Sequence, residues 1–125
     1  MKKLFLTALF ALTITTQVQA ICLTTTSQYS GSLPANAEVT AYGPFSVSQG
    51  SSCLSIGIES KVEGINGRYT PLLILETLEG SRWNRIQASS HGSLSTTVAP
   101  GTYRVRHHNE RANPMVYSGS TSIKR

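Results

Sequence analysis

Two short arginine-containing segments hold the residues best suited to chemistry. Trp83 and Arg85 lie two positions apart, as do Arg104 and Arg106. Side chains alternate between the two faces of a β-strand, so each pair shares one face if its segment is extended. If the two strands are neighbours, the four side chains form a basic surface around one indole. Because Trp and Arg are over-represented at binding hot spots, this pattern predicts binding of a protein or glycan, including an acidic one.

A second interpretation of Trp83 stays open at this point. A single Trp in a small β-domain often packs in the core, and the arginines would then be ordinary solvated charges. The binding hypothesis therefore requires that Arg104 and Arg106 share one face and are not buried in ion pairs.

Enzymatic chemistry is not indicated by the residue types or their spacing. A hydrolase needs a nucleophile, a base and an orienting group, and no serine lies in a G-x-S-x-G motif. The chain contains no Asp, which removes the usual calcium ligands and any Asp-containing triad. Glu59 and Glu76 could act as a glycosidase pair, although carboxylates in a small β-domain more often face solvent. We predict a protein that is not an enzyme and that has no cofactor.

The three histidines do not form a metal-binding motif. His107 and His108 are adjacent, so a strand places them on opposite faces. A zinc site that combines one of them with His91 has no supporting Cys or carboxylate motif. We predict no metal site.

The N-terminus has the pattern of a secretory signal peptide over residues 1–20. Lys2 and Lys3 precede a short apolar run, and Val18-Gln19-Ala20 presents small or apolar residues at the cleavage positions. No later segment is long and apolar enough to span a membrane. The predicted mature chain, residues 21–125, is one domain in the bacterial periplasm or outside the cell.

Two cysteines, Cys22 and Cys53, belong to the predicted mature chain. In an exported protein a disulfide is the expected state, and only one intramolecular pairing exists. Two free thiols or an intermolecular bridge are the alternatives. The disulfide would attach the mature N-terminus to an early strand.

The elements that position these residues are predicted to be strands. Pro100-Gly101 forms a turn, after which Tyr103, Val105 and His107 alternate with the two arginines and His108. The unbroken apolar run 72–75 predicts a central strand covered on both faces. Further strands are expected over residues 36–47, bent at Gly43-Pro44, and over 53–59, 82–88, 94–98 and 115–123.

Two other segments have recognisable local patterns. Residues 24–32 are rich in Ser and Thr and are expected to form an extended arm or loop. Asn66-Gly67 is a strong turn signal and predicts a hairpin whose strands contain Val62, Ile65 and Tyr69. In the strand over 53–59, Leu54, Ile56 and Ile58 are predicted to face the core.

Gly, Pro, Ser and Thr interrupt the mature chain about every ten residues, and no segment has a helical apolar period. This spacing predicts an all-β fold, a small antiparallel β-sandwich of jelly-roll type with seven or eight strands and one disulfide.

Residues 73–80, 99–106 and 117–123 resemble the bacterial pre-peptidase C-terminal domain, a small secreted β-sandwich. The similarity lies in three features. They are a hydrophobic strand that ends at a Gly turn, the sequence motif Ala99-Pro100-Gly101-Thr102-Tyr103, and a final strand that contains Tyr-Ser-Gly-Ser. The resemblance implies a stand-alone binding or accessory domain. It implies no calcium site, because residues 67–70 carry no acid where members often have one.

We therefore predict an exported binding module that uses Trp83, Arg85, Arg104 and Arg106. One alternative is a structural subunit of a cell-envelope or secretion assembly, which an unpaired edge over residues 24–27 would favour. Another is a secreted inhibitor of a hydrolase, with the 109–114 loop or the His91-Gly92 turn entering the target. No aromatic–basic motif for nucleic acid is present.

Overall fold

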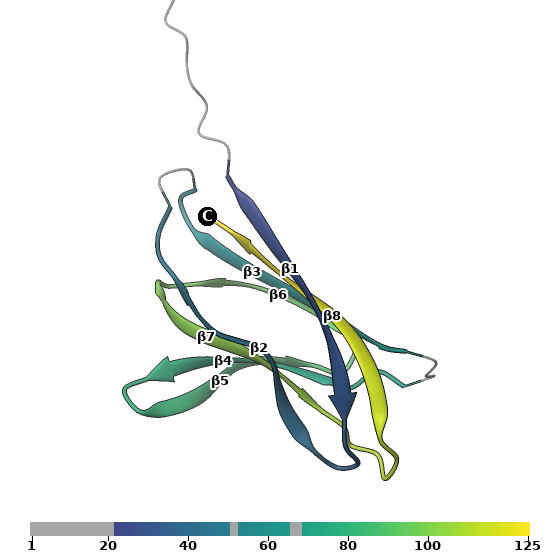
Figure 1. The fold of residues 1–125 in the computed structure, drawn as a ribbon. Coiled ribbons are helices and arrows are strands. Elements are labelled where there is room, and N and C mark those ends of the chain that lie inside the picture. The colour runs from purple at the N-terminus through teal and green to yellow at the C-terminus, as the bar shows by residue number, and fades with distance from the viewer. Residues whose placement is uncertain (1–21, 51–52, 66–68) are drawn as a thin grey trace, which may run out of the picture.

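The computed structural model describes residues 22–50, 53–65 and 69–125. These residues form eight antiparallel strands and no helix, in two four-stranded sheets packed face to face (Figure 1). The strands are β1 (Thr24–Leu33), β2 (Glu38–Val47), β3 (Ile56–Ile65), β4 (Leu72–Glu79), β5 (Arg82–Ser89), β6 (Ser93–Val98), β7 (Gly101–His108) and β8 (Met115–Lys124). The predicted all-β sandwich with one disulfide is confirmed.

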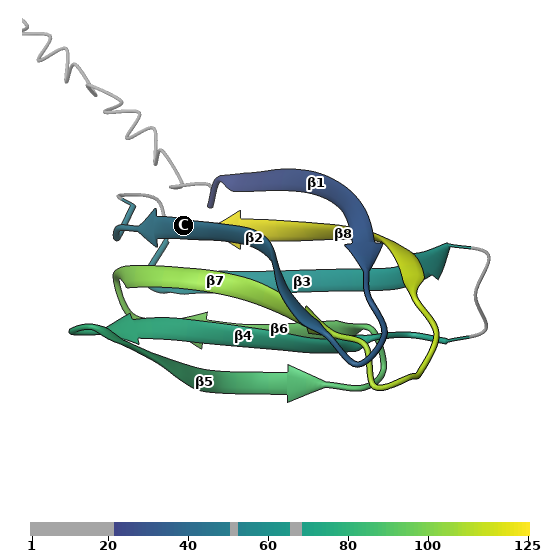
Figure 2. The ribbon, with the colours of Figure 1, turned by 60° about the horizontal axis from the view of Figure 1, so that its bottom comes forward.

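The first sheet has the order β1-β8-β3-β6 and the second has the order β2-β7-β4-β5. Figure 2 shows the four strands of the second sheet side by side in that order. Strands β7 and β4 are therefore interior strands, and the two predicted binding segments lie on β7 and β5 with β4 between them.

The core lies between the sheets and follows the predicted alternation. On β7, Tyr103, Val105 and His107 point inward and are buried, while the arginines between them point outward. On β4, Leu73 and Leu75 belong to the core. Ile74 points to the outer face and is also fully buried, so the predicted burial on both faces is confirmed for residues 73–75, whereas Leu78 further along the outer face is exposed.

The edge strand β2 has an irregular backbone, as Gly43-Pro44 predicts. Its register with β7 shifts between Thr40 and Tyr42 and again between Tyr42 and Phe45. Pro44 has no N–H to donate, so an edge or a bulge is the place where a sheet tolerates it.

The disulfide joins Cys22 to Cys53, as predicted. The segment after Cys22, expected to be an arm or loop, is instead the regular strand β1, paired with β8 from Thr24–Lys124 to Leu33–Met115. The short polar side chains of this segment made it resemble a loop. The backbone ladder with β8 stabilises it as a strand regardless of composition.

Two further expectations are wrong. Leu54 is fully exposed, because β3 begins only at Ile56, while Ile56 and Ile58 are core residues as predicted. Val62 and Ile65 do not belong to a hairpin with the next strand: β3 pairs with β6 and β8, and the chain then crosses to β4 in the other sheet. The Asn66-Gly67 turn lies outside the described residues.

The predicted signal peptide, residues 1–20, also lies outside the described residues. In the part of the chain that is described, no helix is long and apolar enough to cross a membrane.

Candidate functional site

The four predicted binding residues lie on the outer face of the β2-β7-β4-β5 sheet. Arg104 on β7 and Arg85 on β5 both pair in register with Glu76 on the intervening strand β4. Trp83 pairs with Leu78, two positions further along β4 and on the same face. The tertiary structure therefore brings together the two segments that the sequence could only suggest were neighbours.

A bulge in β5 limits this face. The β4–β5 register shifts between Leu75 and Glu76, so that Arg85 opposes Glu76 while Gln87 opposes Leu75. The extra residue at Ile86 reverses the alternation. Gln87 therefore lies on the side of Leu75, which faces the core, and not beside Trp83 as simple alternation predicts.

Arg104 and Arg106 share the outer face, but both are bound in ion pairs. Arg104 Nε lies 2.7 Å from Glu76 Oε1, and their side chains are only 18% and 14% exposed. Arg106 Nε lies 3.2 Å from Glu38 Oε1 and 4.0 Å from Glu76 Oε1. Two carboxylates thus compensate two guanidinium groups, and this part of the face offers no net positive charge.

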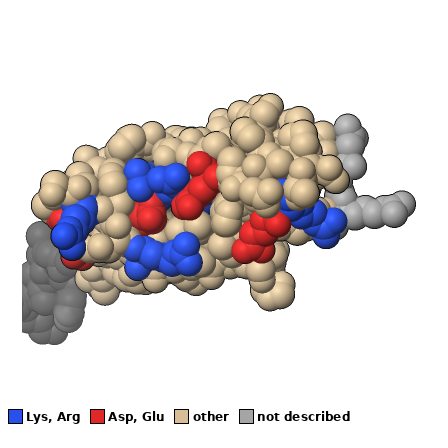
Figure 3. Space-filling view, turned by 90° about the horizontal axis from the view of Figure 1, so that it is seen from below, with Lys and Arg blue, Asp and Glu red and all other residues tan. Residues whose placement is uncertain are grey.

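Figure 3 views the molecule from below and shows acidic side chains interleaved with basic ones on that face. The requirement that Arg104 and Arg106 remain outside buried ion pairs is not met, since both are largely buried and paired. The hypothesis that Arg104 and Arg106 attract a ligand as free cations is therefore wrong, and the outer face over β7 is electrically compensated.

Trp83 is neither buried in the core nor fully exposed to solvent. Its ring is partly exposed, and the Arg104 guanidinium carbon lies 4.2 Å from the ring centroid. The guanidinium contacts the indole on one side and the Glu76 carboxylate at Nε. A cation–π contact and a charge-assisted hydrogen bond therefore act on the same group.

The side chains of Arg85 and Arg82 are exposed, and within the described chain neither guanidinium has an ion-pair or hydrogen-bond partner. Arg85 lies on the outer face beside Trp83 and places free positive charge at the β5 edge, whereas Arg82 pairs with Glu79 and points to the opposite side of the sheet. The basic character predicted for the face is therefore confined to this edge.

Glu38 and Glu76 are part of the arrangement, and no local sequence motif indicates their roles as ion-pair partners. Glu76 interrupts the apolar run of β4, and an acid in a central strand is a signal that it has a basic partner. The partners themselves depend on strand order and register.

A second ordered feature is the loop after β7. Asn109 is fully buried, and its side-chain amide donates to the carbonyl oxygens of Leu33 at 3.4 Å, Pro34 at 3.2 Å and Asn113 at 2.8 Å. Its Oδ1 accepts from the Arg111 N–H at 3.0 Å. The buried Asn109 side chain thus joins the two ends of the loop and attaches the loop to the end of β1.

The exposed part of this loop, residues 110–114, has two further attachments, both at Arg111. The Arg111 carbonyl oxygen accepts a hydrogen bond from the Asn36 N–H at 2.9 Å. The Arg111 guanidinium carbon lies 4.0 Å from the centroid of the Tyr69 ring. The loop is thus a solvent-exposed segment attached at its base and at Arg111.

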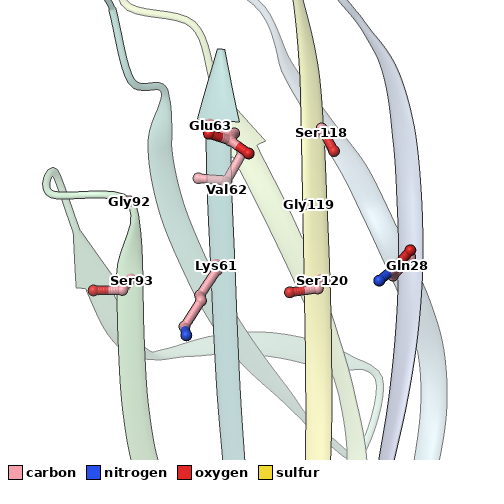
Figure 4. Close-up of a pocket in the computed structure, with 9 residues that line it drawn as sticks. All are labelled: Gln28, Lys61, Val62, Glu63, Gly92, Ser93, Ser118, Gly119 and Ser120. Carbon is pink, nitrogen blue, oxygen red and sulfur yellow. The ribbon is translucent and has the colours of Figure 1, made fainter. Parts of the chain in front are cut away.

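The outer face of the β1-β8-β3-β6 sheet carries a groove of about 430 Å³ (Figure 4). Lys61 in this groove forms an exposed ion pair with Glu59. The remaining lining residues are mostly small or polar: Gln28, Val62, Glu63, Gly92, Ser93, Ser118, Gly119 and Ser120. The groove offers hydrogen-bonding groups but no aromatic ring.

Glu59 lies on the outer face of this first sheet, and Glu76 lies on the outer face of the second. The thickness of the sandwich separates the two carboxylates, so they cannot flank one glycosidic bond.

The histidines are separated as the alternation predicts. His107 is fully buried against Tyr117, with ring centroids 4.5 Å apart, and burial lowers its pKa to about 4. His108 lies on the opposite face of β7, and His91 is exposed in the β5–β6 turn. Among residues 22–50, 53–65 and 69–125, no group of three potential ligands could hold a metal ion.

No protein-family model matches the chain, and no curated protein matches its sequence. Solved structures do match its fold. The crystal structure of the Yersinia pseudotuberculosis-derived mitogen aligns with a TM-score of 0.61 and 16% identity, over 79% of this chain and 86% of that one. Aeromonas hydrophila PliG, a periplasmic lysozyme inhibitor of g-type lysozyme, aligns with a TM-score of 0.52 and 15% identity, over 78% of this chain and 85% of that one. At these identities the comparison establishes the fold alone.

Proposed function

We propose that this chain is an exported, non-catalytic module that binds a protein partner through the outer face of the β2-β7-β4-β5 sheet, centred on Trp83. The observation that carries the proposal is the fixed contact between Trp83 and Arg104, with Arg104 held by Glu76. An exposed part of a large aromatic ring, already restrained before binding, loses little conformational entropy when a partner covers it.

The ion pairs change the expected chemistry of the partner. Arg104 and Arg106 are already compensated, so they orient the surface and do not supply attraction to an acidic ligand. Arg85 supplies that attraction at one edge only. The proposed partner surface is therefore mainly apolar opposite Trp83, with a small acidic region opposite Arg85.

The solved structures with this fold support a non-catalytic role. Two of them are a mitogen and a periplasmic inhibitor of g-type lysozyme, and neither is named as an enzyme. Proteins with different roles thus share this fold, which agrees with a function that resides in surface residues and not in the fold. We place this protein in the periplasm or outside the cell.

The test is comparative capture. Immobilised residues 21–125 are incubated with cell-envelope extract and with extracellular protein, and retained proteins are quantified by mass spectrometry. Trp83→Ala and Arg85→Ala are compared with Ser95→Ala, a matched control on the outer face of the other sheet. A specific partner should be retained about tenfold less by Trp83→Ala and normally by the control. Equal retention by all variants contradicts the proposal. Retention of glycan without any specific protein also contradicts it, because the ligand would then be a sugar.

A second function, inhibition of a hydrolase, is favoured by the loop held by Asn109. Inhibitors that enter a cleft need a protruding segment with a fixed conformation. Residues 110–114 are exposed, and the buried side chain of Asn109 bonds the Asn113 carbonyl oxygen within this loop. Assays with a panel of lysozymes and proteases should show inhibition that Arg111→Ala weakens and Trp83→Ala does not. Absence of inhibition across the panel eliminates this function and leaves the Trp83 proposal intact.

A further inference from the structure

The sandwich has four edge strands: β1 and β6 border one sheet, and β2 and β5 border the other. An edge strand presents unpaired N–H and C=O groups that can pair with another chain. Natural proteins protect such edges with charges, prolines, bulges or short strands.

Three of these edges are protected. Strand β2 contains Pro44 and two register shifts. Strand β5 carries Arg82 and Arg85 and contains the bulge at Ile86. Strand β6 is only 6 residues long. Each of these features disfavours the addition of another strand.

Strand β1 has none of these protections. It is 10 residues long, pairs with β8 in one unbroken register, and contains no charged residue and no proline. Within the described residues, the only backbone group of β1 that is hydrogen-bonded beyond β8 is the Leu33 carbonyl, which accepts from Asn109. No residue of the ranges 22–50, 53–65 and 69–125 therefore pairs with the outward backbone groups between Thr24 and Ser32.

The inner side of β1 makes side-chain contacts with β2 and β8. Tyr29 stacks on Tyr42 with ring centroids 5.4 Å apart and an interplanar angle of 6°. The Tyr29 hydroxyl lies 2.9 Å from Thr121 Oγ1, and the Ser27 hydroxyl lies 3.0 Å from the Tyr42 hydroxyl. These contacts fix the free edge in an extended conformation, so pairing with another strand requires little further ordering.

We propose that the free edge of β1 pairs with the β1 strand of a second copy of this chain, antiparallel, to form a continuous eight-stranded sheet across a two-fold axis. Antiparallel pairing of identical strands is self-complementary, because residue i faces j and j faces i. The chain carries a formal net charge of +5, but none of that charge lies on β1. Two copies therefore approach at this edge without facing like charges.

The side chains of β1 fit such a pairing. With Gln28 at the axis, Thr26 faces the Ser30 position of the second copy and Thr24 faces the Ser32 position. All are short, uncharged and able to hydrogen-bond. Thr26 Oγ1 already makes this kind of cross-strand contact with Ser122 Oγ on β8, at 2.8 Å.

The dimer uses the sheet opposite to the proposed partner surface. Trp83 lies on the outer face of β2-β7-β4-β5, so both copies keep that face exposed. The inference is independent of the proposed function, and the failure of one leaves the other unaffected.

Analytical ultracentrifugation of residues 21–125 tests the inference. The wild type should sediment as a dimer in a concentration-dependent equilibrium. The double variant Gln28→Lys/Ser30→Lys places like charges across the axis and should weaken dimerisation by at least about tenfold. The matched control Ser95→Lys/Thr97→Lys adds the same charge at the β6 edge of the same sheet and should dimerise normally, as should Trp83→Ala.

A monomeric wild type at all concentrations overturns the inference, and so does an undiminished dimer of the β1 variant. Circular dichroism and the unfolding midpoint of each lysine variant establish that it is folded. Gln28→Cys provides a second measurement, since it should form an intermolecular disulfide on mild oxidation, whereas Thr97→Cys should not. Equal cross-linking of the two Cys variants also overturns the pairing.

Discussion

The Arg104 guanidinium lies 4.2 Å from the centroid of the Trp83 ring, although the two residues belong to β7 and β5, strands that do not touch in the sheet. The contact spans β4, and Glu76 on β4 bonds the same guanidinium. A three-strand interaction of this kind couples the exposed aromatic ring to the stability of the sheet.

The first prediction concerns Glu76→Gln. Loss of the carboxylate leaves Arg104 largely buried without its ion pair, so the free energy of unfolding should fall by about 2 kcal/mol in urea denaturation. Trp83 is the only tryptophan, so its fluorescence reports directly on the loosened contact. The emission should shift to longer wavelength.

The matched control is Glu59→Gln, which removes the exposed ion pair with Lys61 on the other sheet. It should change stability by less than about 0.5 kcal/mol and leave the emission unchanged. Equal effects of the two variants would show that the Glu76 pair does not orient Trp83.

The second prediction concerns acid stability and His107. Burial lowers its pKa from 6.5 to about 4 in the native state. Between these values the unfolded chain binds a proton that the native chain does not, so the free energy of unfolding falls as the pH falls. The full loss, roughly 3 kcal/mol, is reached below about pH 4.

His107→Phe keeps an aromatic ring beside Tyr117 and removes the titrating group. Urea denaturation from pH 7 to pH 4 should therefore show a smaller loss of stability for His107→Phe than for the wild type. His91→Gln, at an exposed histidine, should follow the wild type. A His107→Phe profile parallel to the wild type would assign the acid sensitivity to other groups.

The third prediction concerns the disulfide. Cys22 and Cys53 are separated by 31 positions, and in the chain-entropy model a loop of this length contributes about 3–4 kcal/mol. The double variant Cys22→Ser/Cys53→Ser should unfold at a correspondingly lower urea concentration. Its circular dichroism should stay that of a β-protein, because β1 is also held by its full register with β8. Reduced wild type should match the double variant, and a stability equal to the oxidised protein would contradict the prediction.

The fourth prediction concerns the loop after β7. Asn109→Ala removes the side-chain bonds to three carbonyl oxygens and should destabilise the protein by about 2–3 kcal/mol. Limited proteolysis should then cleave within residues 110–114. Asn113→Ala is the control, because only the backbone carbonyl of Asn113 takes part. Resistance of Asn109→Ala to the protease would show that the loop is held by other contacts.

Several features of the fold follow from local sequence patterns. Strict alternation on β7 separates Tyr103 and Val105 from Arg104 and Arg106, and the apolar run before Glu76 marks an interior strand. Both depend only on the period of the strand and on burial of apolar surface, so they are visible without tertiary information. Local patterns failed at β1, where polar residues form a regular strand because β8 pairs with them, and at Leu54, which lies before its strand begins.

The fold class and the faces of β7 could be predicted from sequence, because they depend on strand periodicity. The Cys22–Cys53 pairing was the one intramolecular possibility, but free thiols stayed open until the structure showed the bond. Three features required the folded structure: Glu38 and Glu76 neutralise the arginines, Ile86 forms a bulge, and β1 is an unprotected edge. Those properties depend on which strands are neighbours and in which register. Strand order and register arise from contacts between residues far apart in the chain, which no local pattern specifies.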